Sequence, residues 1–281
     1  MEYTYSDEEL KKLQELELMI LEEVASICDR HNLDYYIYGG SGIGAVRHEG
    51  FIPWDDDMDI ALFRDDYERL LDILDEELDS KFYLIALERQ EECFLPFAKV
   101  CLRNTRFENW WAKQVPFDVG IFIDIFPLEN VPESKFKRVI YHYRCVLLDH
   151  MLMNSLFHIS TGSKPVDLVH KVMHAILKVI PISTGRWKRM YYNALTRYKN
   201  DETDRVTCFF TQKTPSPFGK YDYFLKSEFQ PPRKFKFENL TFSGPNDMDM
   251  VLKRSYNDYM QLPPEEKRVN HAPDVLDFGD Y

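Results

Sequence analysis

The sequence predicts an α/β (α+β) fold, in which helices flank a mixed sheet and a basic helical insertion interrupts the chain. Two periodicities predict it: apolar residues recur every three or four positions in long segments, and short apolar runs between them are typical of buried strands. The third observation is charge, because residues 131–200 hold twelve Lys or Arg against three Asp or Glu in a chain of net charge −12. We therefore expect a core over residues 1–130, the insertion over 131–200, and a segment over 201–281 that completes the core domain.

The N-terminal segment predicts one long helix. Ser6 and Glu9 have the spacing of a capping box, in which each side chain bonds the backbone N–H of the other residue. Apolar residues follow at helical spacing, and we expect the helix to end near His31. A short strand over 35–38 then leads into a turn at Gly39-Gly40-Ser41.

The same two spacings of apolar residues predict the other strands and helices. Strands are expected over residues 58–63, 82–87, 97–102, 120–126 and 206–210. Helices are expected over 67–78, over 133–198 with breaks at 161–165 and 181–185, and over 247–259. Residues 214–219 predict a loop, and residues 233–242 predict a hairpin that turns at Glu238-Asn239.

Composition excludes several classes of protein. An apolar content of 44 % predicts a packed globular chain, and the net charge of −12 argues against general attraction to nucleic acid. The five cysteines have no metal-ligand spacing and fit reduced thiols better than disulfides. The N-terminus is acidic without the apolar region of a signal peptide, and no segment has the ~20 apolar residues that span a bilayer. We expect a cytoplasmic protein.

Four carboxylates lie within five residues, at Asp55, Asp56, Asp57 and Asp59. Such a cluster is costly unless a cation lies among them, and Mg²⁺ (or Mn²⁺) is the candidate. Asp57 and Asp59 share one face of the predicted strand and could bind one metal ion together. Asp55 could contact the metal's waters, whereas Asp56 could cap the turn or hold Arg47.

Phosphate chemistry is indicated upstream of this cluster. Gly39 and Gly40 let the backbone approach a phosphate closely, and Ser41 can donate a hydrogen bond to it. Arg47 and His48 lie between the glycines and the acidic strand, where Arg suits phosphate through its fork of donors. A structural role is an equal expectation for His48.

Three more positions extend the candidate site. Asp124 lies between apolar neighbours in a predicted strand, where a carboxylate is more often functional than incidental. Lys99 and Arg103 share one strand face, which is either a solvated edge or a positive surface that neutralises a pyrophosphate opposite the Asp cluster. Together these residues predict metal-dependent chemistry on a phosphate ester.

Two further features have alternative explanations. The tryptophans Trp54, Trp110 and Trp111 could belong to an aromatic box for a quaternary ammonium, or to the core. The basic helices over 131–200 could pack on the core with their cations in water, or contact an anionic membrane. In the second case, reversing the charges of Arg186, Lys188 and Arg189 is expected to weaken the contact.

The acidic segment resembles the signature of the LicD family. It matches in three parts: Gly39-Gly40-Ser41, then Gly44-Ala45-Val46-Arg47-His48, then Gly50 through Asp59. Two later blocks, Ile121 to Pro127 and Tyr256 to His271, resemble the same family in the same order, with a weaker match over 130–200. Asn257 replaces a glycine that is frequent in the family, and asparagine also tolerates positive φ.

The resemblance implies a nucleotidyltransferase-like sheet in which Asp124 is the third acidic residue, beside Asp57 and Asp59. It implies a donor such as CDP-choline, whose phosphocholine passes to a sugar hydroxyl of a glycan or a lipid-linked glycan, for example a teichoic-acid precursor, with release of CMP. The alternatives are CDP-ribitol or CDP-glycerol as donor, nucleotidylyl transfer on the same fold, and a non-catalytic module that binds glycan or membrane.

Overall fold

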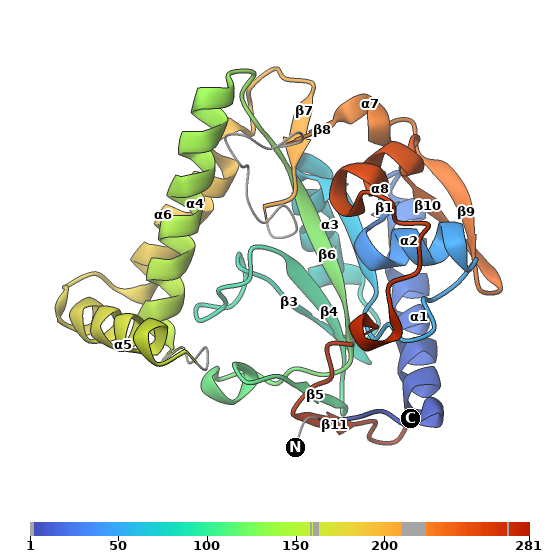
Figure 1. Cartoon of the computed structure of the whole chain (residues 1–281), viewed down its shortest axis with the longest axis horizontal. Coiled ribbons are helices and arrows are strands. Elements are labelled where there is room, and N and C mark those ends of the chain that lie inside the picture. The colour runs from blue at the N-terminus through green and yellow to red at the C-terminus, as the bar shows by residue number, and fades with distance from the viewer. Residues whose placement is uncertain (1–2, 158, 160–162, 210–222, 269) are drawn as a thin grey trace.

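A seven-stranded mixed sheet forms the centre of the molecule (Figure 1). The computed structural model describes residues 3–157, 159, 163–209, 223–268 and 270–281. The strands follow the order β1 (Tyr36–Ile37), β2 (Asp59–Phe63), β6 (Phe122–Asn130), β4 (Ala98–Leu102) and β3 (Phe82–Ile85), with β7 (Arg205–Thr207) between β6 and β8 (Phe224–Leu225). Only the β2–β6 pair among these is parallel, so the predicted mixed sheet is confirmed.

Helices surround the sheet and account for the rest of the core. The α-helices are α1 (Asp7–Arg30), α2 (Gly39–Arg47), α3 (Arg64–Glu77), α4 (Lys135–Leu156), α5 (Lys164–Val179), α6 (Thr184–Leu195), α7 (Lys226–Phe229) and α8 (Met248–Tyr256), and the 3₁₀ turns are η1 (Ala112–Gln114), η2 (Thr196–Tyr198) and η3 (Glu265–Lys267). Two small antiparallel sheets pair β9 (Arg233–Phe237) with β10 (Leu240–Gly244), and β5 (Arg106–Glu108) with β11 (Val275–Asp277).

The first helix forms as the sequence predicts. Ser6 and Glu9 make the capping box, and the helix ends at the C-cap His31. Its apolar side chains, with Leu13, Ile20 and Val24 fully buried, contact α3 and the strands β4 and β6. Helices α1 and α3 therefore anchor the central strand.

The basic insertion consists of three helices, with breaks where the sequence predicts them. Helix α4 packs along α6, and α5 contacts α4, so that the three form an arm beside the sheet (Figure 1). Some of the surplus positive charge attaches this arm to the core. Lys188 donates to the carbonyl of Gln90, and Lys199 forms an ion pair with Glu68.

Several local predictions differ from the structure. The glycine turn is instead the start of α2, because Gly39 at φ +60° redirects the chain and the Gly42 N–H then donates to the Tyr38 carbonyl at 3.1 Å. The strand expected at 206–210 is β7, and the loop expected at 214–219 lies outside the described residues.

The prediction for Asn257 is confirmed, since its φ is +59° at the end of α8. None of the five cysteines, all within the described ranges and all buried, forms a disulfide.

Candidate active site

Three charged side chains form a row across three adjacent strands. Asp59 on β2 lies directly opposite Asp124 on the parallel strand β6, and Lys99 on β4 lies opposite Asp124 on its other side. Neighbouring strands are about 4.8 Å apart, so side chains at matched positions lie side by side. The Lys99 ammonium donates to Oδ1 of Asp124 at 2.6 Å, and all three residues are buried. The strand register thus brings together residues that are 25 or more positions apart in the sequence.

Negative charge outweighs positive charge around this row. Burial, followed by the charges of Asp57 and Asp124, raises the pKa of Asp59 well above its usual range. Burial also raises the pKa of Asp55 to about 8, helped by the charges of Asp57 and Asp56, and raises the pKa of Asp57. Asp124 is less affected because Lys99 opposes the effect of burial, and its pKa rises to about 6. One lysine does not neutralise this many carboxylates.

The N-terminus of α2 touches the acidic cluster through its glycines. A Cβ atom on Gly39 would lie 2.5 Å from Oδ2 of Asp59, and one on Gly40 would lie 2.8 Å from Oδ2 of Asp55. A larger residue at either position would displace a carboxylate, and the φ of +60° at Gly39 also favours glycine there. The hydroxyl oxygen of Ser41 accepts a hydrogen bond from the Asp59 N–H at 2.8 Å, which leaves the hydroxyl hydrogen available to donate. The first N–H groups of a helix are also a natural site for an anion.

Arg47 and His48 connect α2 to the C-terminal segment. Arg47 donates from Nε to Nε2 of His48 at 2.9 Å and from a terminal nitrogen to the Tyr259 carbonyl at 2.8 Å. Burial, followed by the charge of Arg47, lowers the pKa of His48, so the imidazole is neutral and accepts this bond. Both residues thus have structural contacts, although the charge of Arg47 still acts on Asp55.

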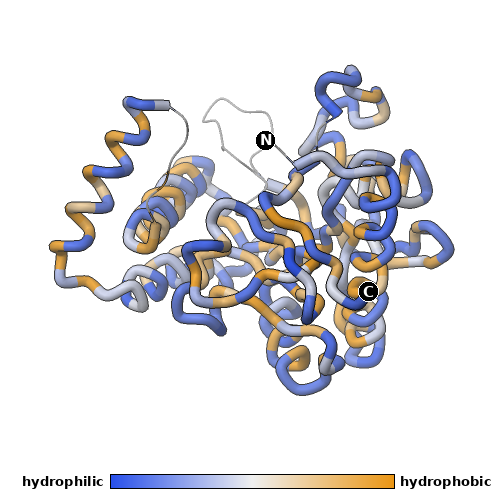
Figure 2. Tube along the Cα trace, turned by 90° about the horizontal axis from the view of Figure 1, so that it is seen from below, coloured by the Kyte–Doolittle hydropathy of each residue, from blue (hydrophilic) through white to orange (hydrophobic). Residues whose placement is uncertain are grey.

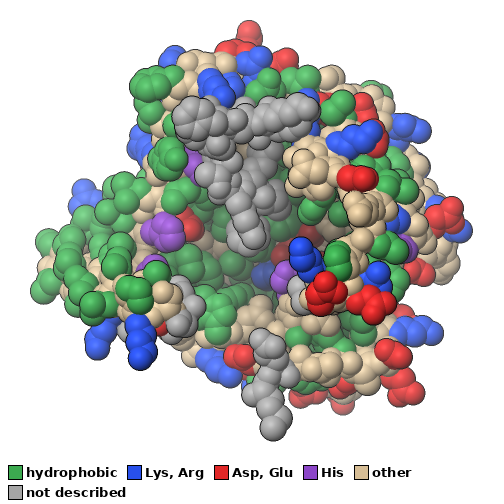
Figure 3. All heavy atoms as spheres, viewed as in Figure 1, with side chains coloured by type: hydrophobic (Ala, Val, Ile, Leu, Met, Phe, Trp, Pro, Cys, Tyr) green, Lys and Arg blue, Asp and Glu red, His purple; other side chains and the backbone are tan. Residues whose placement is uncertain are grey.

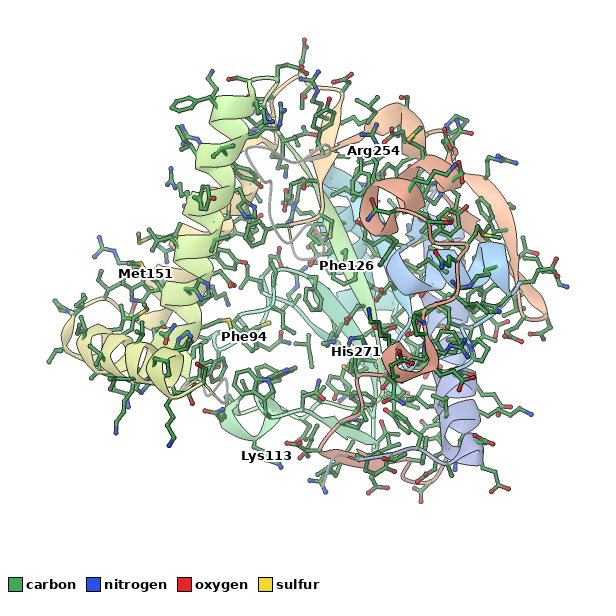
Figure 4. The ribbon with its side chains drawn as sticks, viewed as in Figure 1. Phe94, Lys113, Phe126, Met151, Arg254 and His271 are labelled. Atoms are coloured by element: carbon green, nitrogen blue, oxygen red, sulfur yellow. The ribbon has the colours of Figure 1, made fainter. Side chains whose placement is uncertain are left out.

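Asp56 does not hold Arg47, so that part of the prediction is wrong. Its buried carboxylate accepts from the Tyr5 hydroxyl at 2.8 Å and from the His271 N–H at 2.7 Å. Asp56 therefore ties the segment before α1 and the segment after η3 to the acidic loop. This contact also brings the ring of His271 to 3.6 Å from Asp57 (Figure 4).

The predicted positive surface on β4 contains Lys99 but not Arg103. Strand β4 ends at Leu102, and Arg103 is exposed and donates to the Ser80 carbonyl at 3.0 Å. Four residues of extended chain span about 13 Å, which separates Arg103 from Lys99. We leave Arg103 out of the proposed site.

Two of the three tryptophans belong to one aromatic cluster. Trp110 packs edge-on against Phe157, Trp111 packs edge-on against Phe94, and the two phenylalanine rings are in contact with each other. Trp54 lies instead under the guanidinium of Arg268. The aromatic box for a quaternary ammonium stays a prediction.

Sequence reasoning missed three residues near the cluster: Glu17, Tyr256 and His271. Glu17 on α1 is buried, its Oε2 atom has no hydrogen-bond partner among the described residues, and burial followed by four neighbouring aspartates raises its pKa. The sequence could have drawn attention to Glu17, because this charged residue lies among the apolar residues on the buried face of the first helix. The neighbouring Asp56 carboxylate, then the charge of Asp57, raises the pKa of His271 to about 9, which makes it a cation beside the cluster. The Tyr256 hydroxyl would lie 3.6 Å from a Cβ atom on Gly39.

The donor set has the chemistry that a hard dication prefers, since it consists of carboxylate oxygens in negative excess. Within the described residues, no three or more His, Cys, Asp or Glu side chains are already arranged to hold a metal ion. Lys99 already occupies one oxygen of Asp124. Asp57 and Asp59 are the candidate ligands, with the second oxygen of Asp124.

A mixed sheet with aspartates on adjacent strands, facing a glycine-rich helix start, defines a domain suited to phosphate-ester transfer. Residues 32–152 match the family model described as the LicD/FKTN/FKRP nucleotidyltransferase domain. The chain is also 26 % identical over 276 residues to the lipopolysaccharide cholinephosphotransferase LicD of Haemophilus influenzae, covering 93 % of this chain and 95 % of that protein. These two findings support a phosphotransferase of the LicD family.

Two uncharacterized rickettsial proteins are similar over shorter lengths. The protein of Rickettsia prowazekii is 35 % identical over 92 residues, which is 31 % of this chain and 34 % of that protein. The protein of Rickettsia typhi is 28 % identical over 140 residues, 45 % of this chain and 44 % of that protein.

Proposed function

We propose that this enzyme transfers phosphocholine from CDP-choline to a sugar hydroxyl of a cell-surface glycan, such as lipopolysaccharide or a teichoic-acid precursor, and releases CMP. The observation that carries the proposal is the row of Asp59, Asp124 and Lys99 beside the start of α2. The similarity to the Haemophilus protein, whose name gives phosphocholine as the transferred group and lipopolysaccharide as the acceptor, supports the choice of substrate.

The residues suggest how each part of the transfer is assisted. The acceptor oxygen attacks the phosphorus that bears choline, a new P–O bond forms, and the P–O bond to CMP breaks. Lys99, His271 and the first N–H groups of α2 would offset negative charge on the phosphates. Asp124 would bind the metal ion, accept the hydroxyl proton, or do both.

A divalent ion, Mg²⁺ or Mn²⁺, would be held by Asp57, Asp59 and the second oxygen of Asp124. When bound it would supply charge stabilisation for the transferred phosphate. The surplus of buried carboxylates, including Glu17, is the feature of this chain that supports such an ion.

Other donors remain alternatives on the same site. CDP-ribitol and CDP-glycerol share the cytidine diphosphate group, and nucleotidylyl transfer would place the attack on the other phosphorus. Thermal-shift measurements with Mg²⁺ and each of CDP-choline, CDP-ribitol, CDP-glycerol, CTP and ATP would identify the donor, because a ligand that binds the folded chain raises its melting temperature. We do not keep the non-catalytic alternative, because the family is one of transferases.

The bond that breaks is tested directly with labelled donor. CDP-choline labelled in the choline and in the cytidine, incubated with enzyme and glycan acceptor, should give labelled CMP in solution and choline phosphate on the acceptor. Cytidine on the acceptor would instead establish nucleotidylyl transfer, and no transfer with CDP-choline but transfer with CDP-ribitol would change the donor.

Lys99, within β4, and Arg103, directly after that strand, provide a test variant and a matched control. Lys99→Met should lower kcat by roughly 100-fold, because removal of a preorganised charge donor typically costs 100- to 1,000-fold. Arg103→Met should keep kcat within about twofold, because Arg103 lies on the surface beyond the strand end. Steady-state kinetics on both variants, with circular dichroism as a check of folding, measures the difference. Equal losses in the two variants would contradict the assignment.

A further inference from the structure

Helix α5 turns its apolar face away from the protein. Leu177 is the only buried residue among its 16 residues. Five apolar side chains have between 50 % and 81 % of their surface exposed, namely Leu168, Val169, Val172, Ile176 and Val179. Figure 2 shows α5 extending away from the rest of the chain, and Figure 3 shows hydrophobic side chains gathered over it. We call these five residues the α5 apolar face.

The opposite side of the helix makes the attachment, through two apolar side chains, Leu177 and Met173, and two histidines. Nδ1 of His170 lies 2.9 Å from the side-chain oxygen of Asn154, and Nδ1 of His174 lies 2.6 Å from the Asn154 carbonyl oxygen. Asn154 is fully buried on α4, close to Met151, which marks this end of the arm in Figure 4. An amphipathic helix of a globular protein normally packs its apolar stripe on the core. Helix α5 packs only Leu177 and Met173 in this way, and no other described part of the chain buries the α5 apolar face, which we take as a surface for an external partner.

Charge identifies the kind of partner. Lys164, Lys171 and Lys178 follow one another at seven-residue spacing and form a line along one border of the α5 apolar face, and all three are exposed. Asp167 is the only acidic residue in the sequence of this helix. A symmetric contact between two copies of α5 would bring these lysines into one interface and cause like-charge repulsion. An anionic bilayer offers apolar depth to the face and negative charge to the lysines.

We propose that α5 docks the enzyme on an anionic membrane surface, with its apolar face inserted at the boundary between headgroups and acyl chains. Among the described helices none is long and apolar enough to cross a bilayer, and α5 would lie in the plane of the interface. The contact differs from the one expected from charge alone, which rested on Arg186, Lys188 and Arg189. Lys188 is already used inside the protein, where it bonds the Gln90 carbonyl.

Co-sedimentation of the full chain with vesicles tests this surface. Phosphatidylcholine vesicles containing phosphatidylglycerol should bind the wild type, and binding should weaken as the salt concentration rises from about 50 mM to about 500 mM, because screening shortens the reach of the lysines. The triple variant Leu168→Gln, Val172→Gln, Ile176→Gln should bind at least tenfold more weakly. The control variant Met260→Gln, Leu262→Gln, which changes two apolar residues that are 54 % and 47 % exposed elsewhere, should bind like the wild type.

A second variant separates charge from apolar contact. Lys164→Glu, Lys171→Glu, Lys178→Glu should lower binding to anionic vesicles at low salt. All of these side chains are exposed, so the variants should keep the wild-type circular dichroism spectrum and transfer to a short soluble acceptor.

Three results would overturn the docking surface. These are no vesicle binding by the wild type at low salt, equal binding by the apolar triple variant, or a concentration-dependent dimer that the triple variant converts to monomer without any vesicle binding by the wild type. Failure of transfer activity with CDP-choline would not affect the proposal, which concerns the membrane alone.

Discussion

Replacing Asp59 by Asn is expected to lower kcat by roughly 1,000-fold or more and to leave the fold intact, and Asp57→Asn should do the same. Asp59 begins β2 opposite Asp124, and Asp57 lies two residues before it. Loss of one candidate metal ligand removes charge stabilisation worth several kcal/mol in the transition state. The measurement is steady-state kinetics at saturating Mg²⁺. Asp65→Asn is the control, because Asp65 is an exposed aspartate at the start of the next helix.

The same variants should be more stable than the wild type when metal is removed. Folding raises the pKa of Asp59, so the ionised carboxylate destabilises the folded state, and this effect grows as the pH rises above the usual carboxyl range. Asparagine cannot ionise. The melting temperature of Asp59→Asn in a chelating buffer should therefore exceed that of the wild type at pH 7, and the difference should shrink toward about pH 4. Near wild-type turnover in either variant would show that the site is misassigned.

The parts of the fold that depend on local pattern could be predicted from the sequence. The capping box at Ser6, the breaks within the basic helices and the hairpin turn at Glu238 each depend on a few neighbouring residues, and all are present. The strand that carries Asp59 could also be predicted, but it begins at Asp59, so Asp57 lies before it and strand alternation does not set the direction of its side chain. The position of Asp124 next to Asp59 could not be predicted from local pattern, because it depends on the register of β2 against β6.

The failures share a different cause, which is contact between distant segments. Arg103 has the strand parity of Lys99, but the strand ends one residue before it. His271 reaches the site because its N–H donates to Asp56, 215 positions away. Contacts with neighbouring elements also determine the pairing of β5 with β11 and the outward direction of the α5 apolar face. The spacing of apolar residues within one segment does not predict such contacts.

The strand pair that aligns Asp59 with Asp124 is closed at its other end by a buried ion pair. Arg64 follows β2 directly, and Nε of its guanidinium donates to Oε1 of Glu129 on β6 at 3.0 Å. A further nitrogen of Arg64 reaches Glu88 at 3.2 Å, and the guanidinium lies over the ring of Tyr67. Arg64 and Glu129 are almost completely buried. This pair therefore holds β2 to β6 one position beyond the last residue of the paired register.

Arg64→Met is expected to lower the free energy of unfolding by about 3 to 5 kcal/mol, because it leaves the Glu129 carboxylate buried without its partner. For a chain of this size such a loss lowers the melting temperature by roughly 10 °C. The double variant Arg64→Met, Glu129→Leu should recover part of that loss, since it removes the unpaired Glu129 charge but leaves the mostly buried Glu88 carboxylate without its cation. Arg69→Met, on the same helix but exposed and paired only with Asp66, should change stability by less than about 0.5 kcal/mol. Denaturant unfolding of the four proteins gives the comparison. A double variant that is as unstable as Arg64→Met would mean that the guanidinium acts through Glu88 and its packing on Tyr67, and the pair with Glu129 would then have no part in holding the two strands together.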